Sequence, residues 1–109
     1  MTVPVEHLFI LSAILFAIGT AGFFLRRNVI IVLMSIELML NAANLAFLAA
    51  SRMHTLEAGA TEASLQGPMF AIFVIVVAAV EAAVGLALVI ALYRNQQTVD
   101  LEQVTALKN

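Results

Sequence analysis

Apolar residues are gathered into three long segments, which occupy approximately residues 4–25, 29–50 and 68–93. Polar and charged residues lie mainly between these segments and after the last of them. A helix of about 20 apolar residues spans the hydrocarbon core of a bilayer, and each segment is at least that long. The pattern therefore predicts an all-α membrane protein in which residues 1–109 form a single membrane domain with three transmembrane helices.

The connections between the segments differ in length. Arg26, Arg27 and Asn28 make a very short turn, so we expect the first two helices to be antiparallel neighbours, with Asn28 capping the second. Residues 51–67 are predicted to form an outer loop, which is long enough to lead to a helix that does not neighbour the second. Residues 94–109 form a polar C-terminal tail, predicted to be either an interfacial helix or a loosely ordered segment.

The composition excludes a soluble domain. The chain is 63% hydrophobic and 11% charged, with a mean hydropathy of +1.07, whereas soluble proteins carry about 25% charged residues. Cysteine is absent, which excludes disulfides and cysteine-ligated iron–sulfur or metal sites. His7 and His54 lie outside the apolar cores and lack the spacing of a haem or metal pair. We expect a chain without a cofactor or metal of its own that works inside a larger assembly.

Basic residues predict how the chain is oriented, because lysine and arginine in short loops favour the inner side of the membrane. The turn and the tail share one side if the chain crosses three times, and together they carry four of the five basic residues. The N-terminal stretch has none, and the long loop has only Arg52. We predict the N-terminus outside, in the periplasm, and the C-terminus in the cytoplasm, with Arg26 and Arg27 as topology anchors; the alternative for these two arginines is that they shape the inner entrance of a proton path.

Two carboxylates interrupt the apolar segments. Glu37 lies near the middle of the second segment and shares one helix face with Asn41 and Asn44, because positions i, i+4 and i+7 align in a helix. Glu81 lies near the middle of the third segment. A charged residue at the bilayer centre costs about 2.5 kcal/mol or more, and by default it marks an ion or proton path.

Helix geometry predicts similar depths for the two acids. Glu37 lies ten residues after Arg27, roughly 15 Å along a helix, and Glu81 lies thirteen residues before Arg94, roughly 20 Å. A low-dielectric surrounding disfavours the charged form of a carboxyl group in general, which suits such a group to exchange protons. We therefore predict Glu37 and Glu81 as proton-relay residues supported by the two asparagines. The alternative is that both acids only donate hydrogen bonds between helices.

Small residues predict where helices pack. Gly19 and Gly22 thin the first helix and favour the close approach of a neighbour. We expect the hydroxyl groups of Ser12 and Ser35 to bond the backbone of their own helices. A second candidate packing face in the third segment consists of alanines at every fourth position, namely Ala79, Ala83, Ala87 and Ala91.

Two glutamate-centred motifs carry a resemblance to a known family. They are the runs Ser35-Ile-Glu-Leu-Met-Leu-Asn-Ala-Ala-Asn44 and Val80-Glu-Ala-Ala-Val-Gly-Leu-Ala-Leu88. The Arg26-Arg27-Asn28 turn and the three-span plan are further features of the resemblance. In these features the chain, up to about Tyr93, resembles subunit K of bacterial NADH:quinone oxidoreductase. That enzyme is respiratory complex I, and the mitochondrial equivalent of the subunit is subunit 4L.

The resemblance implies a multi-pass subunit of the bacterial inner membrane, packed beside membrane-arm subunits of the A, J, H and N types. It implies that Glu37 and Glu81 match two acids of the hydrophilic axis between the quinone site and the antiporter-like pumping subunits. Arg26 and Arg27 match the basic inner turn of the family. FMN, iron–sulfur clusters and quinone are expected in other subunits, so this chain is expected to be a non-redox part of a proton-translocating enzyme that catalyses nothing alone.

Three other interpretations are open to test. The nearest is the C-type subunit of those cation/proton antiporters that are assembled from several subunits, which is similar in size and plan. Another is a purely structural assembly subunit. A small multidrug exporter is disfavoured, because that family has four spans and an acid in its first helix with aromatic residues around it. The first segment here has no mid-span acid, and the chain has no tryptophan.

Overall fold

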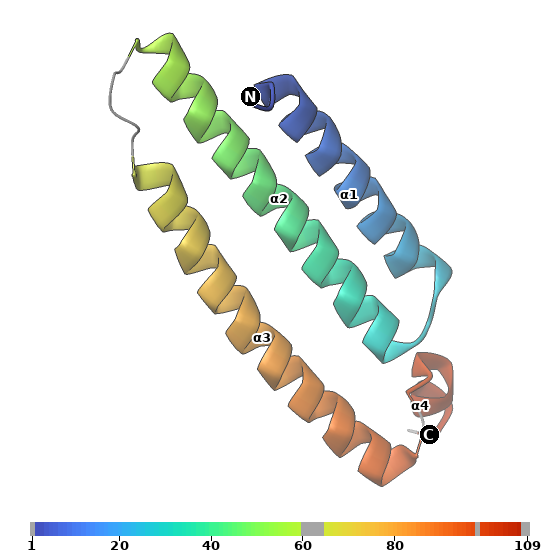
Figure 1. The fold of residues 1–109 in the computed structure, drawn as a ribbon. Helices are drawn as coiled ribbons and strands as arrows, with labels where there is room; N and C mark the ends of the chain where they lie inside the picture. The colour runs from blue at the N-terminus through green and yellow to red at the C-terminus, as the bar shows by residue number, and fades with distance from the viewer. Residues whose placement is uncertain (1, 60–64, 98, 108–109) are drawn as a thin grey trace.

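A computed structural model describes residues 2–59, 65–97 and 99–107. Within these ranges the chain forms four helices and no strand (Figure 1): α1 (Val5–Leu25), α2 (Val29–Glu57), α3 (Gln66–Gln96) and α4 (Leu101–Leu107). The first three are each long and apolar enough to cross a membrane. The predicted all-α protein with three membrane-spanning helices is confirmed, and the side of the membrane on which each terminus lies stays a prediction.

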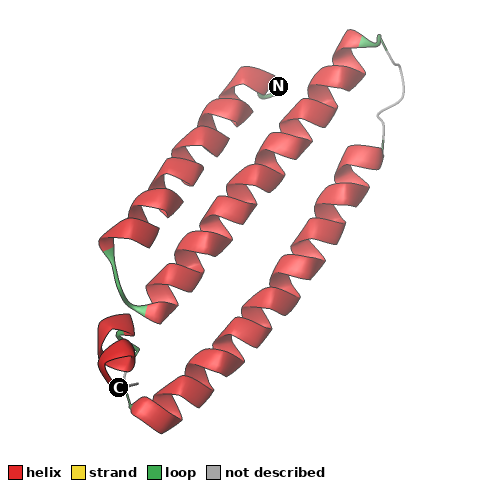
Figure 2. Ribbon diagram, turned by 180° about the vertical axis from the view of Figure 1, so that it is seen from behind, coloured by secondary structure: helices red, strands yellow, loops and turns green. Residues whose placement is uncertain are grey.

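The middle helix of the bundle is α2. Figures 1 and 2 show α1 on one side of it and α3 on the other, each antiparallel to α2. The chain extends over 61 × 24 × 23 Å. Since α3 packs directly against α2, the connection between them joins two adjacent helices and does not lead to a distant one.

Glycines bring α1 close to α2. A Cβ atom at Gly19 would lie 2.7 Å from Met39 Cγ and 2.9 Å from the Ser35 carbonyl oxygen, and one at Gly22 would lie 2.6 Å from Ser35 Oγ. Any side chain at either position would push into α2, so the absence of one allows the two backbones to approach closely. The predicted packing role of both glycines is confirmed.

Two buried serines bond in different ways. Ser12 Oγ donates a hydrogen bond to the Ala42 carbonyl oxygen at 2.6 Å and so links α1 to α2. The expectation that Ser12 bonds its own helix is wrong, because this residue lies on the buried face of α1, within reach of the next helix. Ser35 Oγ donates to the Ile31 carbonyl oxygen of its own helix at 2.8 Å, as predicted.

Two contacts show how α3 is aligned with α2. The methyl groups of Leu33 lie 3.3 Å from where a Cβ atom of Gly85 would be, and Ser51 lies against Gly67 near the other end of the pair. The two contact positions are eighteen residues apart on each helix. The two helices therefore have the same rise per residue between these contacts. Each residue of α2 in this stretch lies at the same level as one residue of α3.

The face of α3 that meets α2 lies one position away from the predicted alanine stripe. The four alanines of that stripe, including Ala79 and Ala83, are exposed within this chain. The contact face is made of the buried and half-buried residues Gly67, Ala71, Val74, Ala78, Ala82, Gly85 and Val89. Both stripes consist largely of small residues, and one residue corresponds to a rotation of about 100° around the helix.

Both α2 and α3 continue beyond the apolar segments. Residues 51–57, expected at the start of the outer loop, belong to α2. From Val29 to Ala58 the sequence contains neither glycine nor proline, and Gly59, just after the helix, has a φ of 61°. Hydropathy marks the part of a helix that crosses a membrane and not the point where its backbone hydrogen bonding ends. Residues 60–64 of the expected loop lie outside the described residues.

The C-terminal tail folds back onto the α1–α2 turn. Gln97 takes a left-handed conformation, with a φ of 52°, at the end of α3. The Val29 N–H then donates to the Val99 carbonyl oxygen at 2.9 Å, and the Leu101 N–H donates to the Arg27 carbonyl oxygen at 3.0 Å. The short helix α4 follows and lies beside the turn in Figure 2. The weak helical pattern of the tail therefore corresponds to a helix that is docked on the rest of the chain.

Candidate functional site

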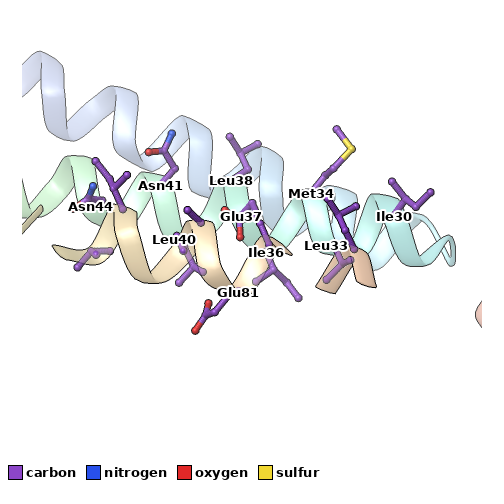
Figure 3. A pocket seen from close by; sticks show the side chains of 16 residues that line it. Ile30, Leu33, Met34, Ile36, Glu37, Leu38, Leu40, Asn41, Asn44 and Glu81 are labelled. Carbon is purple, nitrogen blue, oxygen red and sulfur yellow. The ribbon is translucent and has the colours of Figure 1, made fainter. Parts of the chain in front are cut away.

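A groove between α2 and α3 holds all the acids and amides that the sequence places in the site. Its cavity volume is about 690 Å³, and its polar lining residues are Glu37, Asn41 and Asn44 from α2 and Glu81 from α3 (Figure 3). The other lining residues are apolar. The groove thus gathers four polar side chains within an apolar wall.

Small side chains on α3 leave the space that forms this groove. Ala78, Ala79 and Ala82 line it on the α3 side. Ala78 and Ala82 are half-buried against α2, and they precede and follow Glu81 on the same helix. Larger side chains at these positions would fill the space beside the acids, so the small residues serve both the helix contact and the cavity.

Glu37 and Glu81 lie at the same level of the two antiparallel helices. The contact between Leu33 and Gly85 provides the reference point. Four residues after Leu33 the chain reaches Glu37, and four residues before Gly85 it reaches Glu81. The fold therefore brings to one height two acids that are far apart in the sequence, as the counts from the basic residues predict.

The two acids nevertheless have different surroundings. Glu37 is half-buried and lies between α2 and α3, whereas Glu81 is exposed. Figure 3 shows the Glu81 carboxylate extending from α3 on the side away from α2. Glu37 is therefore open to the groove between the helices, and Glu81 stands at its rim and faces the outer surface of α3.

The two asparagines also differ. Asn44 is only 5% exposed, and among the described residues its Oδ1 atom has no hydrogen-bond partner. A buried acceptor left without a donor costs about 1–3 kcal/mol. Asn41 is exposed. The stripe that the sequence predicts on one face of α2 thus contains one exposed amide and one buried amide, and both line the groove.

Arg26 and Arg27 lie at the α1–α2 turn and do not line the groove. Arg27 forms an ion pair with Glu102 of α4, and the two side chains are 68% and 65% exposed. An ion pair this exposed contributes about 0–1 kcal/mol. The pair joins the tail to the turn, and Arg26 is exposed at the same end of the bundle.

The start of helix α4 and its docking on the α1–α2 turn were not predicted from the sequence. Asp100 Oδ1 accepts hydrogen bonds from the Glu102 N–H at 2.8 Å and the Gln103 N–H at 3.4 Å, so Asp100 caps α4. An acidic residue followed three positions later by glutamine is a signal for a helix N-terminus. That signal is present in the sequence and predicts a helix starting at Leu101.

Comparison with known proteins gives a consistent result over nearly the whole chain. Residues 7–109 match the family model for NADH-ubiquinone/plastoquinone oxidoreductase chain 4L. The NADH-quinone oxidoreductase subunit K of an Anaeromyxobacter species is 54% identical over 105 residues, which are 96% of this chain and 97% of that protein. The subunit K of Methylacidiphilum infernorum is 50% identical over 108 residues, 99% of each chain.

A third relative extends the pattern. Subunit K 1 of the NADH-quinone oxidoreductase of Solibacter usitatus is 49% identical over 107 residues, which are 98% of this chain and 96% of that protein. Together with the three membrane-spanning helices, these bacterial relatives make the chain a multi-pass protein of the inner membrane. The match to the family model and the identity to its relatives show that the chain belongs to the chain 4L, or subunit K, family of NADH-quinone oxidoreductases.

Proposed function

We propose that this chain is the K-type membrane subunit of a proton-translocating NADH:quinone oxidoreductase, respiratory complex I, and that Glu37 and Glu81 relay protons within it. Family membership supports its place as a membrane subunit in a hetero-oligomer with other complex I subunits. The observation that carries the relay is the pairing of the two acids at one level of a groove otherwise lined by two amides and apolar residues.

The chemistry of the step needs only carboxyl groups and their hydrogen-bond partners. A carboxyl group has two oxygens, so it can receive a proton at one and release it from the other. A proton moves between heavy atoms at about 2.6–3.2 Å or through one intervening water. In this proposal, waters in the groove connect Glu37 to its neighbours, and the accessible amide of Asn41 orients them without adding charge.

The different exposures of the two acids support a path across the α2–α3 pair. Glu37 is reached through the groove, whereas Glu81 is reached from the outer surface of α3. In this proposal, protons pass from one neighbouring subunit to another by way of these two side chains. The neighbours are subunits of the A, J, H and N types, as the family resemblance implies.

The proposal assigns no electron-transfer step to this chain. FMN, the iron–sulfur clusters and quinone belong to other subunits, and the chain alone catalyses nothing. Its exposed apolar side chains support a role inside an assembly, since Phe24 and Leu25 are 76% and 78% exposed in the isolated chain. Such surface is stable only against lipid or neighbouring subunits.

The test is to replace each acid with glutamine in the complete enzyme and to compare both variants with Glu57→Gln, because Glu57 is exposed at the end of α2. We expect normal assembly in all three. Coupled quinone reduction should fall sharply in Glu37→Gln and Glu81→Gln and stay normal in the control. Wild-type coupled activity in both assembled variants would leave the acids with a purely structural role.

Purification separates the nearest rival function. If the chain is a complex I subunit, it co-purifies with flavin and iron–sulfur proteins and with NADH:quinone activity. If it is the C-type subunit of a cation/proton antiporter, it purifies without these groups and supports sodium or potassium exchange for protons.

A further inference from the structure

We infer that residues 99–107, named here the C-terminal clasp, hold α3 in register with α2 and so position Glu81 relative to Glu37. This inference rests on the proposed function and adds a positioning role for a segment outside the groove. It starts from two backbone hydrogen bonds, from Val29 to Val99 and from Leu101 to Arg27, which tie the tail to the α1–α2 turn.

Each of these bonds uses a helix N-terminal donor. The Val29 N–H is the first of α2, and the Leu101 N–H is the first of α4. Such donors have no partner within their own helix. The carbonyl groups of Val99 and Arg27 satisfy them instead, so the two helix starts are joined through the backbone and without reliance on side chains.

Two further contacts support the same junction. The ion pair between Arg27 and Glu102 spans the turn and α4, and the Asp100 carboxylate caps α4. A single residue, which lies outside the described ranges, separates the clasp from Gln97, the C-cap residue of α3. A fixed clasp therefore fixes the end of α3 relative to the start of α2.

The rest of the α2–α3 pair gives weaker control of register. The contact face of α3 is mostly glycine and alanine, whose low relief offers few protrusions to lock the helices against sliding. Eight residues connect the other ends of α2 and α3. A connection of that length can span any separation up to roughly 27 Å, so its length alone does not set the register.

Register matters because of the short range of proton transfer. Sliding α3 by a single residue would move Glu81 by about 1.5 Å relative to Glu37. A path through waters needs each step between heavy atoms to be about 2.6–3.2 Å, so a displacement of that size breaks one of its steps. The clasp thus protects a geometry that the groove itself does not secure.

Proline provides a selective test in the assembled complex. Val29→Pro and Leu101→Pro each delete one clasp donor at a first helical position, where proline is tolerated. Val29→Ala and Leu101→Ala are the matched controls, because they remove side-chain atoms and keep the N–H. Glu102→Gln is a further control, because the ion pair that it removes is exposed and contributes little beside the two backbone hydrogen bonds.

Two readouts separate positioning from other effects. The chain has no natural cysteine, so Leu33→Cys with Gly85→Cys gives one oxidisable pair within it, and the cross-linked peptide is measured by mass spectrometry. Protons pumped per NADH are measured in the same variants without the cysteines. We expect each proline change to lower the rate of cross-linking about fivefold, because the loss of one hydrogen bond of about 1 kcal/mol corresponds to a factor of that size. Proton yield should fall with it, while the three controls stay near wild type.

Unchanged cross-linking in the assembled proline variants would overturn the inference. So would reduced cross-linking with a normal proton yield, because register would then not govern the relay. Failure of both proline variants to assemble, with assembled alanine controls, would make the clasp an assembly element and not a positioning one. The glutamine variants of the two acids test the proposed function separately, so its failure is distinguishable from failure of the clasp.

Discussion

Glu37 and Glu81 lie at one level of the α2–α3 pair, yet their carboxylates face different surroundings. Glu37 is half-buried between the two helices, and Glu81 extends from the outer side of α3. The shared level follows from two glycine contacts, and the different exposure follows from where each acid lies around its helix. This relationship gives the two acids different expected neighbours, which mutation can distinguish.

Replacing the buried Asn44 is expected to have opposite effects on stability and on proton transfer. Asn44→Leu removes a buried amide whose Oδ1 has no partner among the described residues, so we expect the complex to assemble and withstand heating at least as well as wild type. Because the Asn44 amide is predicted to support the relay, we expect the proton yield to fall in the same variant. Thermal inactivation and proton pumping are measured together, and Asn41→Leu, at an exposed amide, is the comparison for thermal inactivation alone. Loss of assembly or of heat resistance in Asn44→Leu alone would contradict the expectation that its Oδ1 is unsatisfied.

Gly19 is predicted to be intolerant of even a methyl group. The added Cβ of Gly19→Ala would lie 2.9 Å from the Ser35 carbonyl oxygen, a backbone atom that cannot rotate away. We expect α1 and α2 to separate slightly, at a cost of about 1–3 kcal/mol, and less assembled complex in the membrane. Gly85→Ala is the control, because its Cβ meets only the movable end of Leu33 at 3.3 Å. Equal assembly of the two variants would contradict the close α1–α2 contact.

The hydrogen bond between Ser12 and Ala42 predicts a modest loss of stability. Ser12→Ala removes the donor of that bond, and we expect a cost of about 0.5–1.5 kcal/mol with no effect on proton yield in the assembled enzyme. Thr20→Val serves as the comparison, because the Thr20 hydroxyl bonds its own helix at Phe16. Thermal inactivation of the purified complex measures both, and the larger effect should belong to Ser12→Ala.

Much of this arrangement is predictable from residue patterns. The apolar segments predict the three long helices, and the spacing of Glu37, Asn41 and Asn44 predicts their common face. The short turn predicts that α1 and α2 are antiparallel neighbours. These features depend on local rules that act within one helix or across one tight connection.

The face of α3 that meets α2 could not be chosen in advance. Stripes through Ala78 and Ala79 both consist largely of small residues, and only the tertiary contact selects the first. The bond from Ser12 to Ala42 was missed for a related reason, since a buried serine reaches its own backbone and a neighbouring helix equally well. The loop was expected to start at residue 51, and this was wrong because α2 continues beyond its apolar part to Glu57.

The most direct test of the account is the rate of proton pumping by the complete enzyme carrying Glu37→Gln. Glutamine keeps the size of the side chain and can still form hydrogen bonds, but it cannot take up or release a proton. We predict an assembled complex whose proton transfer is about tenfold or more below wild type, with partial retention in Glu37→Asp. A wild-type rate of proton pumping by assembled Glu37→Gln would contradict the role of this acid as a proton carrier.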